Sequence, residues 1–143
     1  QFVIGNSKLI SKVIDGKFPD YKKVVPVTNE KILTVSSKEF IDSIERVTTV
    51  SLDRKEGVKM IINKDNVKLS VNSSNSGDGN EVIKANYNSD ELNISFNSKY
   101  LIDIASAIED KSLQMSLKDS VSPVLIQDKS DRNSYYVIMP MKI

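Results

Sequence analysis

Residues 37–42 have the sequence SKEFID, and residues 98–103 repeat its pattern as SKYLID. Each stretch starts with Ser, which can cap a helix N-terminus. Each continues with apolar residues that begin a stripe at helical spacing. The match is short, and its alternative explanation is the chance convergence of two capped helix starts. Its position inside two matching orders of elements favours an internal repeat.

The first stretch begins a helix inside a β-α-β-β-β pattern. A short strand is expected at 32–35, and Ser36 with Glu39 fits a capping box. The predicted apolar stripe of the helix contains Phe40, Ile41, Ile44 and Val47. The β-rich runs that follow the helix are 58–62, 67–71 and 82–87. Residues 72–80 contain Gly, Asn, Ser and Asp, and we expect a mobile loop there with no core residue.

The second stretch lies in the same order of elements. Residues 92–96 alternate as a strand, and Asn97 or Ser98 is expected to cap the next helix. The apolar stripe of this helix contains Leu101, Ile104, Ala105 and Ile108. The strands expected after it are 113–117, 124–126 and 135–139. The sequence therefore predicts an α+β domain with pseudo-two-fold symmetry, in which two helices pack against antiparallel sheets.

The N-terminal segment precedes the first repeat. A turn signal at Gly5-Asn6 predicts a hairpin within residues 2–14, and Pro19 and Pro26 indicate an extended connector. The chain begins with Gln and not Met, as a piece of a longer chain would, although a removed tag or processing would give the same start. We therefore expect residues 1–24 to be the tail of a preceding domain with its connector, and residues 25–143 to form the next domain.

The composition excludes most catalytic and metal-binding classes. The chain has 143 residues and contains neither Cys nor His. It therefore lacks thiolate ligands and the commonest general base. No phosphate-binding Gly-rich loop is present. Acidic pairs such as Glu109-Asp110 lie at element ends, and residues 128–131 fit a hairpin turn better than a calcium loop. We expect no catalytic residues, no metal and no cofactor.

Charge and hydropathy set further limits. The chain carries 20 Lys and Arg against 19 Asp and Glu, a net charge of +1. A strongly basic nucleic-acid grip is therefore not indicated. Weak, sequence-independent contact with DNA phosphates is expected from cations on or near the helices. These cations are Lys38, Arg46, Arg54, Lys55 and Lys99. Without a membrane span or a signal peptide, we expect a soluble, cytoplasmic protein with no membrane partner.

The last nine residues are unusually apolar. Alternation places Tyr136 and Ile138 on one face of a strand and Val137 and Met139 on the other. Exposed Met beside aliphatic side chains forms an adaptable surface that suits the docking of partner peptides. The alternative is a final core strand.

Three motifs resemble a known family. They are the DGKFPDY run at 15–21, DSVSPV at 119–124 and the ending YVIMPMKI at 136–143. Their order and spacing along the entire chain resemble the final third of the bacterial DNA polymerase III beta subunits, the sliding clamps. The resemblance implies the third of three similar domains, with two full-length copies closing into a homodimer ring around duplex DNA.

The implied function is non-catalytic: a sliding clamp tethers the polymerase to DNA and raises processivity, with its helices facing the DNA. The implied partners are duplex DNA, the DNA polymerase III alpha subunit, clamp loader subunits, and other polymerases and repair proteins. Proteins of this kind dock through short, mostly apolar peptides in a groove between the second and third domains. The alternative is a structural module that only packs against neighbouring domains.

The resemblance also assigns groove positions in this sequence. The connector wall is Pro19, Tyr21, Lys23 and Val24. The loop wall is Ser120, Val121 and Pro123. The floor is Val137, Ile138, Met139, Pro140 and Met141, and the rim is Lys142 and Ile143. This chain departs from the family at Lys23 and Lys142, where Arg is common, and at Pro123, where Ser is common. These departures bear on affinity, because Lys weakens a bidentate contact and Pro123 removes a donor and stiffens the loop.

Overall fold

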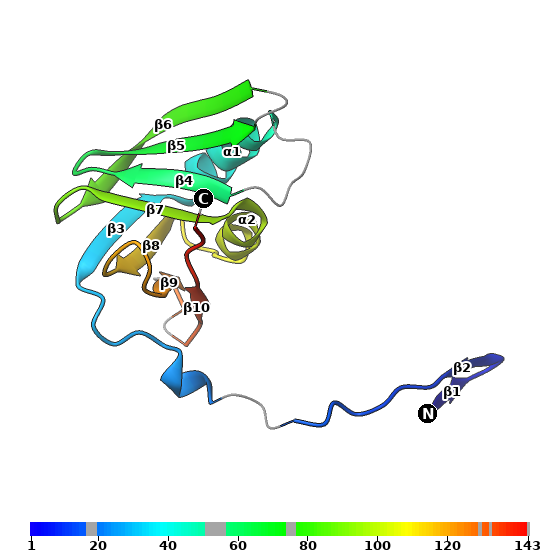
Figure 1. Cartoon of the computed structure of the whole chain (residues 1–143). Coiled ribbons are helices and arrows are strands. Elements are labelled where there is room, and N and C mark those ends of the chain that lie inside the picture. Colours follow the sequence, from blue (N-terminus) through cyan, green and yellow to red (C-terminus); the bar gives the residue numbers. More distant parts are fainter. Residues whose placement is uncertain (17–19, 51–56, 74–76, 129, 132, 143) are drawn as a thin grey trace.

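The structure is a computed structural model, and it describes residues 1–16, 20–50, 57–73, 77–128, 130, 131 and 133–142. Its elements before the second repeat are β1 (Phe2–Ile4), β2 (Ser7–Leu9), the 3₁₀ turn η1 (Tyr21–Lys23), β3 (Lys31–Ser36), α1 (Ser37–Thr48), β4 (Gly57–Ile62), β5 (Asn66–Ser73) and β6 (Gly77–Tyr87). The remaining elements are β7 (Leu92–Asn97), α2 (Ser98–Ser106), β8 (Ser112–Leu117), β9 (Val124–Asp128) and β10 (Tyr135–Ile138). The order from β3 to β10 is the predicted repeat (Figure 1).

The two repeats exchange their first strands. The described antiparallel sheet has the order β10-β9-β8-β3-β6-β5-β4-β7. Strand β3 of the first repeat pairs along its whole length with β8 of the second repeat. Strand β7 of the second repeat pairs along its whole length with β4 of the first. The α+β architecture with pseudo-two-fold symmetry is therefore confirmed, and each group of three strands is completed by a strand from the other repeat.

The C-terminal segment brings the two edge strands of this sheet together. The Met141 N–H donates a hydrogen bond of 2.8 Å to the carbonyl oxygen of Ser95 in β7. The repeat alignment equates Ser95 with Thr34, which pairs with Asn86 where β3 meets β6. The contact at Ser95 is therefore the pseudo-symmetric counterpart of the β3–β6 pairing. The sheet curls around the two helices, and the last described residues lie beside β7 (Figure 1).

Both helices begin at capped residues. The Glu39 N–H donates to Ser36 Oγ at 3.4 Å, and the Tyr100 N–H donates to Asn97 Oδ1 at 3.3 Å. Of the two residues expected to cap the second helix, Asn97 is therefore the cap. Each cap satisfies a backbone donor that the first helical turn leaves without an intrahelical partner.

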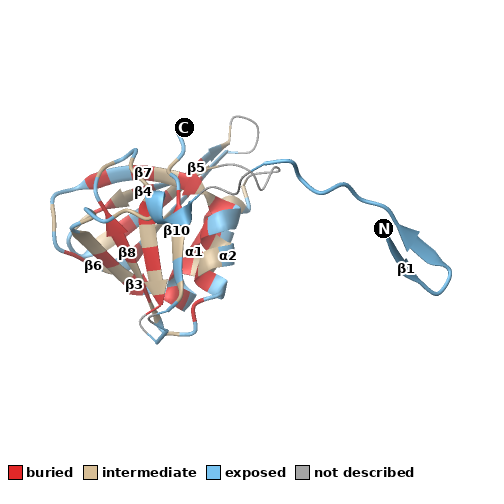
Figure 2. Cartoon of the chain, turned by 90° about the horizontal axis from the view of Figure 1, so that it is seen from below, coloured by how far each residue is buried: buried red, intermediate tan, exposed pale blue. Residues whose placement is uncertain are grey.

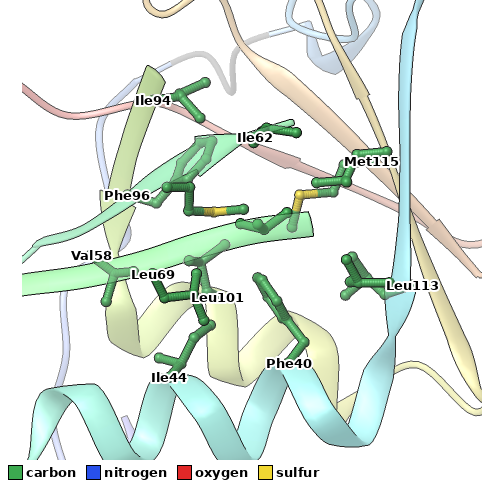
Figure 3. Close-up of a cluster of buried hydrophobic side chains, with 14 of the residues drawn as sticks. Phe40, Ile44, Val58, Ile62, Leu69, Ile94, Phe96, Leu101, Leu113 and Met115 are labelled. Atoms are coloured by element: carbon green, nitrogen blue, oxygen red, sulfur yellow. The ribbon is translucent and has the colours of Figure 1, made fainter. Parts of the chain in front are cut away.

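The helices lie side by side and bury most of their predicted stripes against the sheet. Ile108, expected in the second stripe, lies beyond the end of α2 but is also buried. Phe40 and Ile44 of α1 and Leu101 of α2 have no exposed surface, and Figure 3 shows all three pointing at side chains of the strands. Met115 in β8 and Met60 in β4 fill the layer opposite them. Burial is concentrated between the helices and the sheet (Figure 2). Apolar area removed from water at this layer stabilises the fold by about 25 cal/mol per Å².

The expected mobile loop at 72–80 is wrong for the described part of that segment. Strand β5 continues to Ser73 and β6 starts at Gly77, with Ser73 opposite Gly77 and Val71 opposite Gly79 in the register. Gly79 is buried. The side chains of this segment are polar and gave no sign of a strand in the sequence. The strands pair regularly all the same, because the pairing uses main-chain groups that every non-proline residue carries. Residues 74–76 lie outside the described residues.

The N-terminal segment forms a separate two-stranded sheet. Strands β1 and β2 pair antiparallel from Phe2 opposite Leu9 to Ile4 opposite Ser7, so the predicted hairpin is shorter than expected. It stands apart from the rest of the chain (Figure 1), and its side chains are exposed. Turn η1 follows, where the Lys22 N–H donates to Asp20 Oδ1 at 3.1 Å. The domain boundary between residues 24 and 25 stays a prediction.

Candidate functional site

A cavity of about 580 Å³ lies between α2 and the last strand. We call it the β10 cavity. The residues that line it are Tyr100, Asp103 and Ile104 of α2 and Tyr135, Tyr136, Val137, Ile138 and Met139. Most of this lining is apolar, as in sites that accept side chains of a ligand. Three residues of the predicted groove floor are therefore brought together here: Val137, Ile138 and Met139.

The position of β10 explains which floor residues are accessible. This strand pairs with β9 only, so it forms an edge of the described sheet. Ile138 is 4% exposed and belongs to the core, while the neighbouring Met139 is 57% exposed. Val137 is half-buried. The alternation predicted for this strand is confirmed at Ile138 and Met139, and it leaves a flexible thioether side chain at the surface.

Tyr100 is a residue of this cavity that the sequence reasoning missed. It is 57% exposed although it is aromatic, and it sits in the first turn of α2 beside the Asn97 cap. The repeat carried a signal for it, because Tyr100 stands where the first repeat has the charged Glu39. An exposed aromatic residue beside a cavity presents a large contact area with little conformational entropy to lose on binding.

The predicted loop wall is organised by Asp119. Its carboxylate accepts hydrogen bonds from the Val121 N–H at 2.9 Å, from the Ser122 N–H at 2.7 Å and from Ser122 Oγ at 2.9 Å. The backbone N–H of Val121 is the main cause that lowers the pKa of Asp119. Val121 is 62% exposed, Ser120 is exposed and Pro123 is half-buried. The turn therefore presents Val121 to solvent.

The predicted connector wall is also at the surface. Tyr21 is 56% exposed and Val24 is 46% exposed, and Lys23 is exposed as well. None of the described connector-wall or loop-wall residues lines the β10 cavity. Met141 and Lys142 are exposed and Pro140 is half-buried. Pro19 and Ile143 lie outside the described residues.

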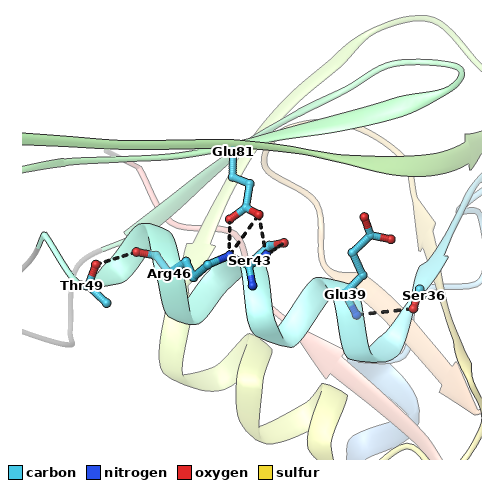
Figure 4. A network of polar contacts seen from close by, with 6 residues as sticks. All are labelled: Ser36, Glu39, Ser43, Arg46, Thr49 and Glu81. Carbon is cyan, nitrogen blue, oxygen red and sulfur yellow. Dashed lines mark hydrogen bonds and ion pairs between the residues drawn. The ribbon is translucent and has the colours of Figure 1, made fainter.

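The helix cations expected to face DNA are largely engaged by carboxylates. Arg46 forms an ion pair with Glu81 of β6, which raises the pKa of Arg46 and lowers the pKa of Glu81 (Figure 4). Lys99 pairs with Asp103 at 2.6 Å, and this hydrogen bond raises the pKa of Lys99. Within the described part of the chain, Lys38 has no carboxylate partner.

Arg54 and Lys55, also expected to face DNA, lie outside the described residues. The described helix surface therefore offers little unpaired positive charge for phosphates.

Among the residues that the structure describes, no group of three or more metal-ligating side chains comes together. Neither described helix has the length and apolar character needed to cross a bilayer.

Comparison with known protein families identifies the fold. The family described as the DNA polymerase III beta subunit, C-terminal domain, matches residues 22–142. The chain belongs to this family. The resemblance seen in the sequence motifs is therefore confirmed, and the curled sheet with two helices is a DNA-clamp fold.

Curated relatives extend well beyond this chain. It is 34% identical over 143 residues to the beta sliding clamp of Caulobacter vibrioides, an alignment that covers 100% of this chain and 38% of the relative. It is 30% identical over 140 residues to the beta sliding clamp of Escherichia coli K12, covering 98% of this chain and 38% of the relative. The chain thus spans little more than a third of the length of these sliding clamps.

Solved structures of sliding clamps have the same fold as this chain. A Bartonella birtlesii sliding clamp bound to griselimycin superposes with a TM-score of 0.87 at 39% identity, covering 91% of this chain and 35% of that chain. The beta subunit of Thermotoga maritima superposes with a TM-score of 0.85 at 31% identity, covering 92% of this chain and 36% of that chain.

Proposed function

We propose that this chain is the C-terminal domain of a sliding clamp that encircles duplex DNA and keeps the replicative polymerase on it. The observation that carries the proposal is the family match over residues 22–142, joined to a clamp fold with a TM-score of 0.87 to a solved clamp. Because the relatives are much longer, the ring would be completed by the preceding part of the protein, and two copies would close it.

The chemistry of the described helices supports holding DNA by encirclement. Two of the helix cations, Arg46 and Lys99, are already paired with carboxylates. A ring needs no tight phosphate grip, because its topology keeps it on the duplex. Any direct contact with DNA would be non-specific and weakened by salt.

The β10 cavity would be the place where partners dock. It combines exposed aromatic and thioether side chains, Tyr100 and Met139, with the aliphatic Ile104 and Val137. This lining suits a short peptide with adjacent Leu and Phe side chains. The proposed partners are the DNA polymerase III alpha subunit, clamp loader subunits, and other polymerases and repair proteins. The Bartonella relative, crystallised with griselimycin bound, supports a ligand site in this family.

Two experiments test the proposal. In the first, a fluorescent peptide carrying Leu-Phe is titrated against the chain, with a Leu-Phe to Ala-Ala peptide as control. Saturable binding by the first peptide alone supports docking. A module that only packs against neighbouring domains would bind neither.

The second experiment uses the full-length protein that contains this chain. The protein is loaded onto circular duplex DNA, and half of the sample is then linearised by a restriction enzyme. A clamp stays on the circles and slides off the linear DNA. Equal retention on both would contradict encirclement, whatever the outcome of the peptide titration.

A further inference from the structure

One side-chain amide joins the segment between η1 and β3 to the loop between β8 and β9. The Asn29 Nδ2 group donates one hydrogen bond to the carbonyl oxygen of Ser116 and a second to the carbonyl oxygen of Pro123, each at 2.8 Å. Ser116 lies in β8, and Pro123 directly precedes β9. The two acceptors therefore stand on either side of the loop 118–122, whose Ser120 and Val121 belong to the predicted loop wall.

The backbone pairing of β8 with β9 ends at Ser116, which is one of the two residues whose carbonyl oxygens accept from Asn29. The register of β8 and β9 runs from Leu113 opposite Asp128 to Ser116 opposite Leu125 and goes no further. Pro123 has no N–H to offer to a neighbouring strand. A group with two N–H donors can hold both carbonyl oxygens at once, and the amide of Asn is the smallest neutral side chain with that capacity. The Asn29 side chain thus links Ser116 to Pro123 just beyond the last residues that β8 and β9 pair through their backbones.

The other end of this link is the segment that directly follows the predicted connector. Asn29 follows η1 after a short segment that contains Pro26, whose ring restricts the backbone, and Val25 and Pro26 are half-buried. Turn η1 carries the predicted connector-wall residues Tyr21 and Lys23. Asp119 orders the loop internally, but nothing in its contacts fixes the loop to the connector. The Asn29 amide joins the loop to the short segment that leads from η1 to β3.

We propose that Asn29 is a positioning residue, which holds the loop 118–123 against the segment between η1 and β3, so that the predicted loop wall keeps a fixed relation to the predicted connector wall. This inference rests on the proposed docking function. It concerns a residue outside the three sequence motifs, and it predicts that losing one amide loosens a loop that begins almost ninety residues further along the chain.

Two asparagines with different hydrogen bonds, Asn29 and Asn88, supply a test substitution and a matched control. Asn29 Oδ1 is buried and has no hydrogen-bond partner among the described residues, so Asn29→Asp removes the donor that the loop uses and breaks no hydrogen bond at Oδ1, while it adds a negative charge. Asn88 has the opposite arrangement, because its Oδ1 accepts from the Ile32 N–H at 2.9 Å. Asn88→Asp therefore adds the same charge near β3 but keeps its hydrogen bond. Asn29→Ala removes the donor without adding charge, in case Asn29→Asp fails to fold.

The experiment measures amide hydrogen exchange and peptide affinity in the 143-residue chain. We expect Asn29→Asp and Asn29→Ala to speed exchange at the Val121 and Ser122 amides about fivefold to tenfold, as for the loss of a partly buried hydrogen bond. Exchange in β4 and β5 should stay unchanged, and Asn88→Asp should resemble the parent. Affinity for the Leu-Phe peptide should fall by a similar factor in the Asn29 variants alone.

The outcomes separate this inference from the proposed function. Unchanged exchange at Val121 and Ser122, or exchange that speeds equally in β4 and β5, would overturn the positioning role. A loosened loop with unchanged peptide affinity would overturn its link to docking. If the parent chain binds no Leu-Phe peptide, the docking function fails in this chain, and the exchange measurement still decides whether Asn29 positions the loop.

Discussion

Gly79 of β6 lies directly against the backbone of Val47 in α1. A Cβ atom at Gly79 would stand 2.4 Å from the Val47 carbonyl oxygen and 3.0 Å from its Cα atom. Two residues further along β6, Glu81 forms its ion pair with Arg46. A close backbone approach and an exposed ion pair therefore fasten the same turn of α1 to the same strand. The contact needs a residue without a side chain, because the atoms in the way belong to the main chain.

Replacing Gly79 by Ala should therefore destabilise the domain. The helix would have to move off β6, and overpacking of this kind costs roughly 1 to 3 kcal/mol. Urea denaturation followed by circular dichroism measures the free energy of unfolding. The control is Gly16→Ala in the connector, where a Cβ atom meets nothing within 4 Å. Equal stability of the two variants would show that α1 can shift without cost.

Met139→Ala should weaken peptide binding more than it weakens the fold. The Met139 side chain is 57% exposed and lines the β10 cavity, so its loss at a central contact costs roughly 1 to 2 kcal/mol of binding. Ile138→Ala is the matched control, since Ile138 is only 4% exposed and a core truncation costs about 2 to 5 kcal/mol of stability. Peptide titration and thermal melting are compared for both. If Met139→Ala kept its peptide affinity but had a much lower melting temperature, Met139 would contribute to the core and not to peptide binding.

DNA binding by this chain should be weak and salt-sensitive. With a net charge of +1, we expect a dissociation constant of about 10⁻⁴ to 10⁻⁶ M at physiological salt, the range of non-specific contact. Lys38→Gln should lower the affinity, because Lys38 lies on α1 without a carboxylate partner among the described residues. Lys59→Gln should not, because Lys59 is exposed between the buried residues Val58 and Met60 and so lies on the outer face of β4. Fluorescence anisotropy against salt measures both, and tight or salt-resistant binding would contradict the expectation.

Asp128 should make stability depend on pH in the acid range. The Ser130 hydroxyl is the main cause that lowers its pKa below the ordinary 3.8, helped by the N–H groups of Glu109 and Ser130. Because the folded-state pKa is the lower one, the stabilisation is present above the unfolded value and is lost as the pH falls through the folded value. Asp128→Asn should therefore melt at a lower temperature than the parent at pH 7.

The difference between Asp128→Asn and the parent should shrink as the pH falls below about 3.8. Asp119 and Asp131 also have lowered pKa values in the fold, so only this difference isolates Asp128. Asp15→Asn, in the exposed connector, supplies a control for the change in net charge. A constant difference at all pH values would show that the carboxylate charge of Asp128 is not what stabilises the turn.

The sequence predicted most of this fold because local signals and tertiary packing agree. Ser36 and Asn97 cap the helices where capping chemistry requires them, and the buried sides of Phe40 and Leu101 follow helical spacing. The ribbon at 72–73 and 77–80 was missed, because its pairing is carried by the backbone and by the contact of Gly79 with Val47. No short-range pattern encodes that contact.

The candidate site was predicted less completely for a related reason. Met139 and Val137 could be placed on one face by alternation, but Tyr100 joins them only through the tertiary fold. Asn29 has the same character, since its two acceptors lie 87 and 94 residues away in the sequence. Contacts between residues so far apart in the sequence produce no regular spacing, so a single sequence does not predict them.

The exchange of first strands between the repeats also governs how the domain folds. The first repeat pairs its own four strands in the order β3-β6-β5-β4. In the described sheet, β7 of the second repeat pairs with β4 of the first repeat and not with β8–β10, so the second repeat cannot complete its own sheet. Strand β3 pairs with β6 only at Leu33–Val35 and needs β8 to pair along its whole length, and β7 must return to the finished β4. Native contacts of such long range slow the search for the folded state, toward the millisecond-to-second times of β-rich domains. A chain cut in the turn between β6 and β7 would give two pieces that each lack one strand. Those pieces should form the complete sheet only when mixed, as a split protein does.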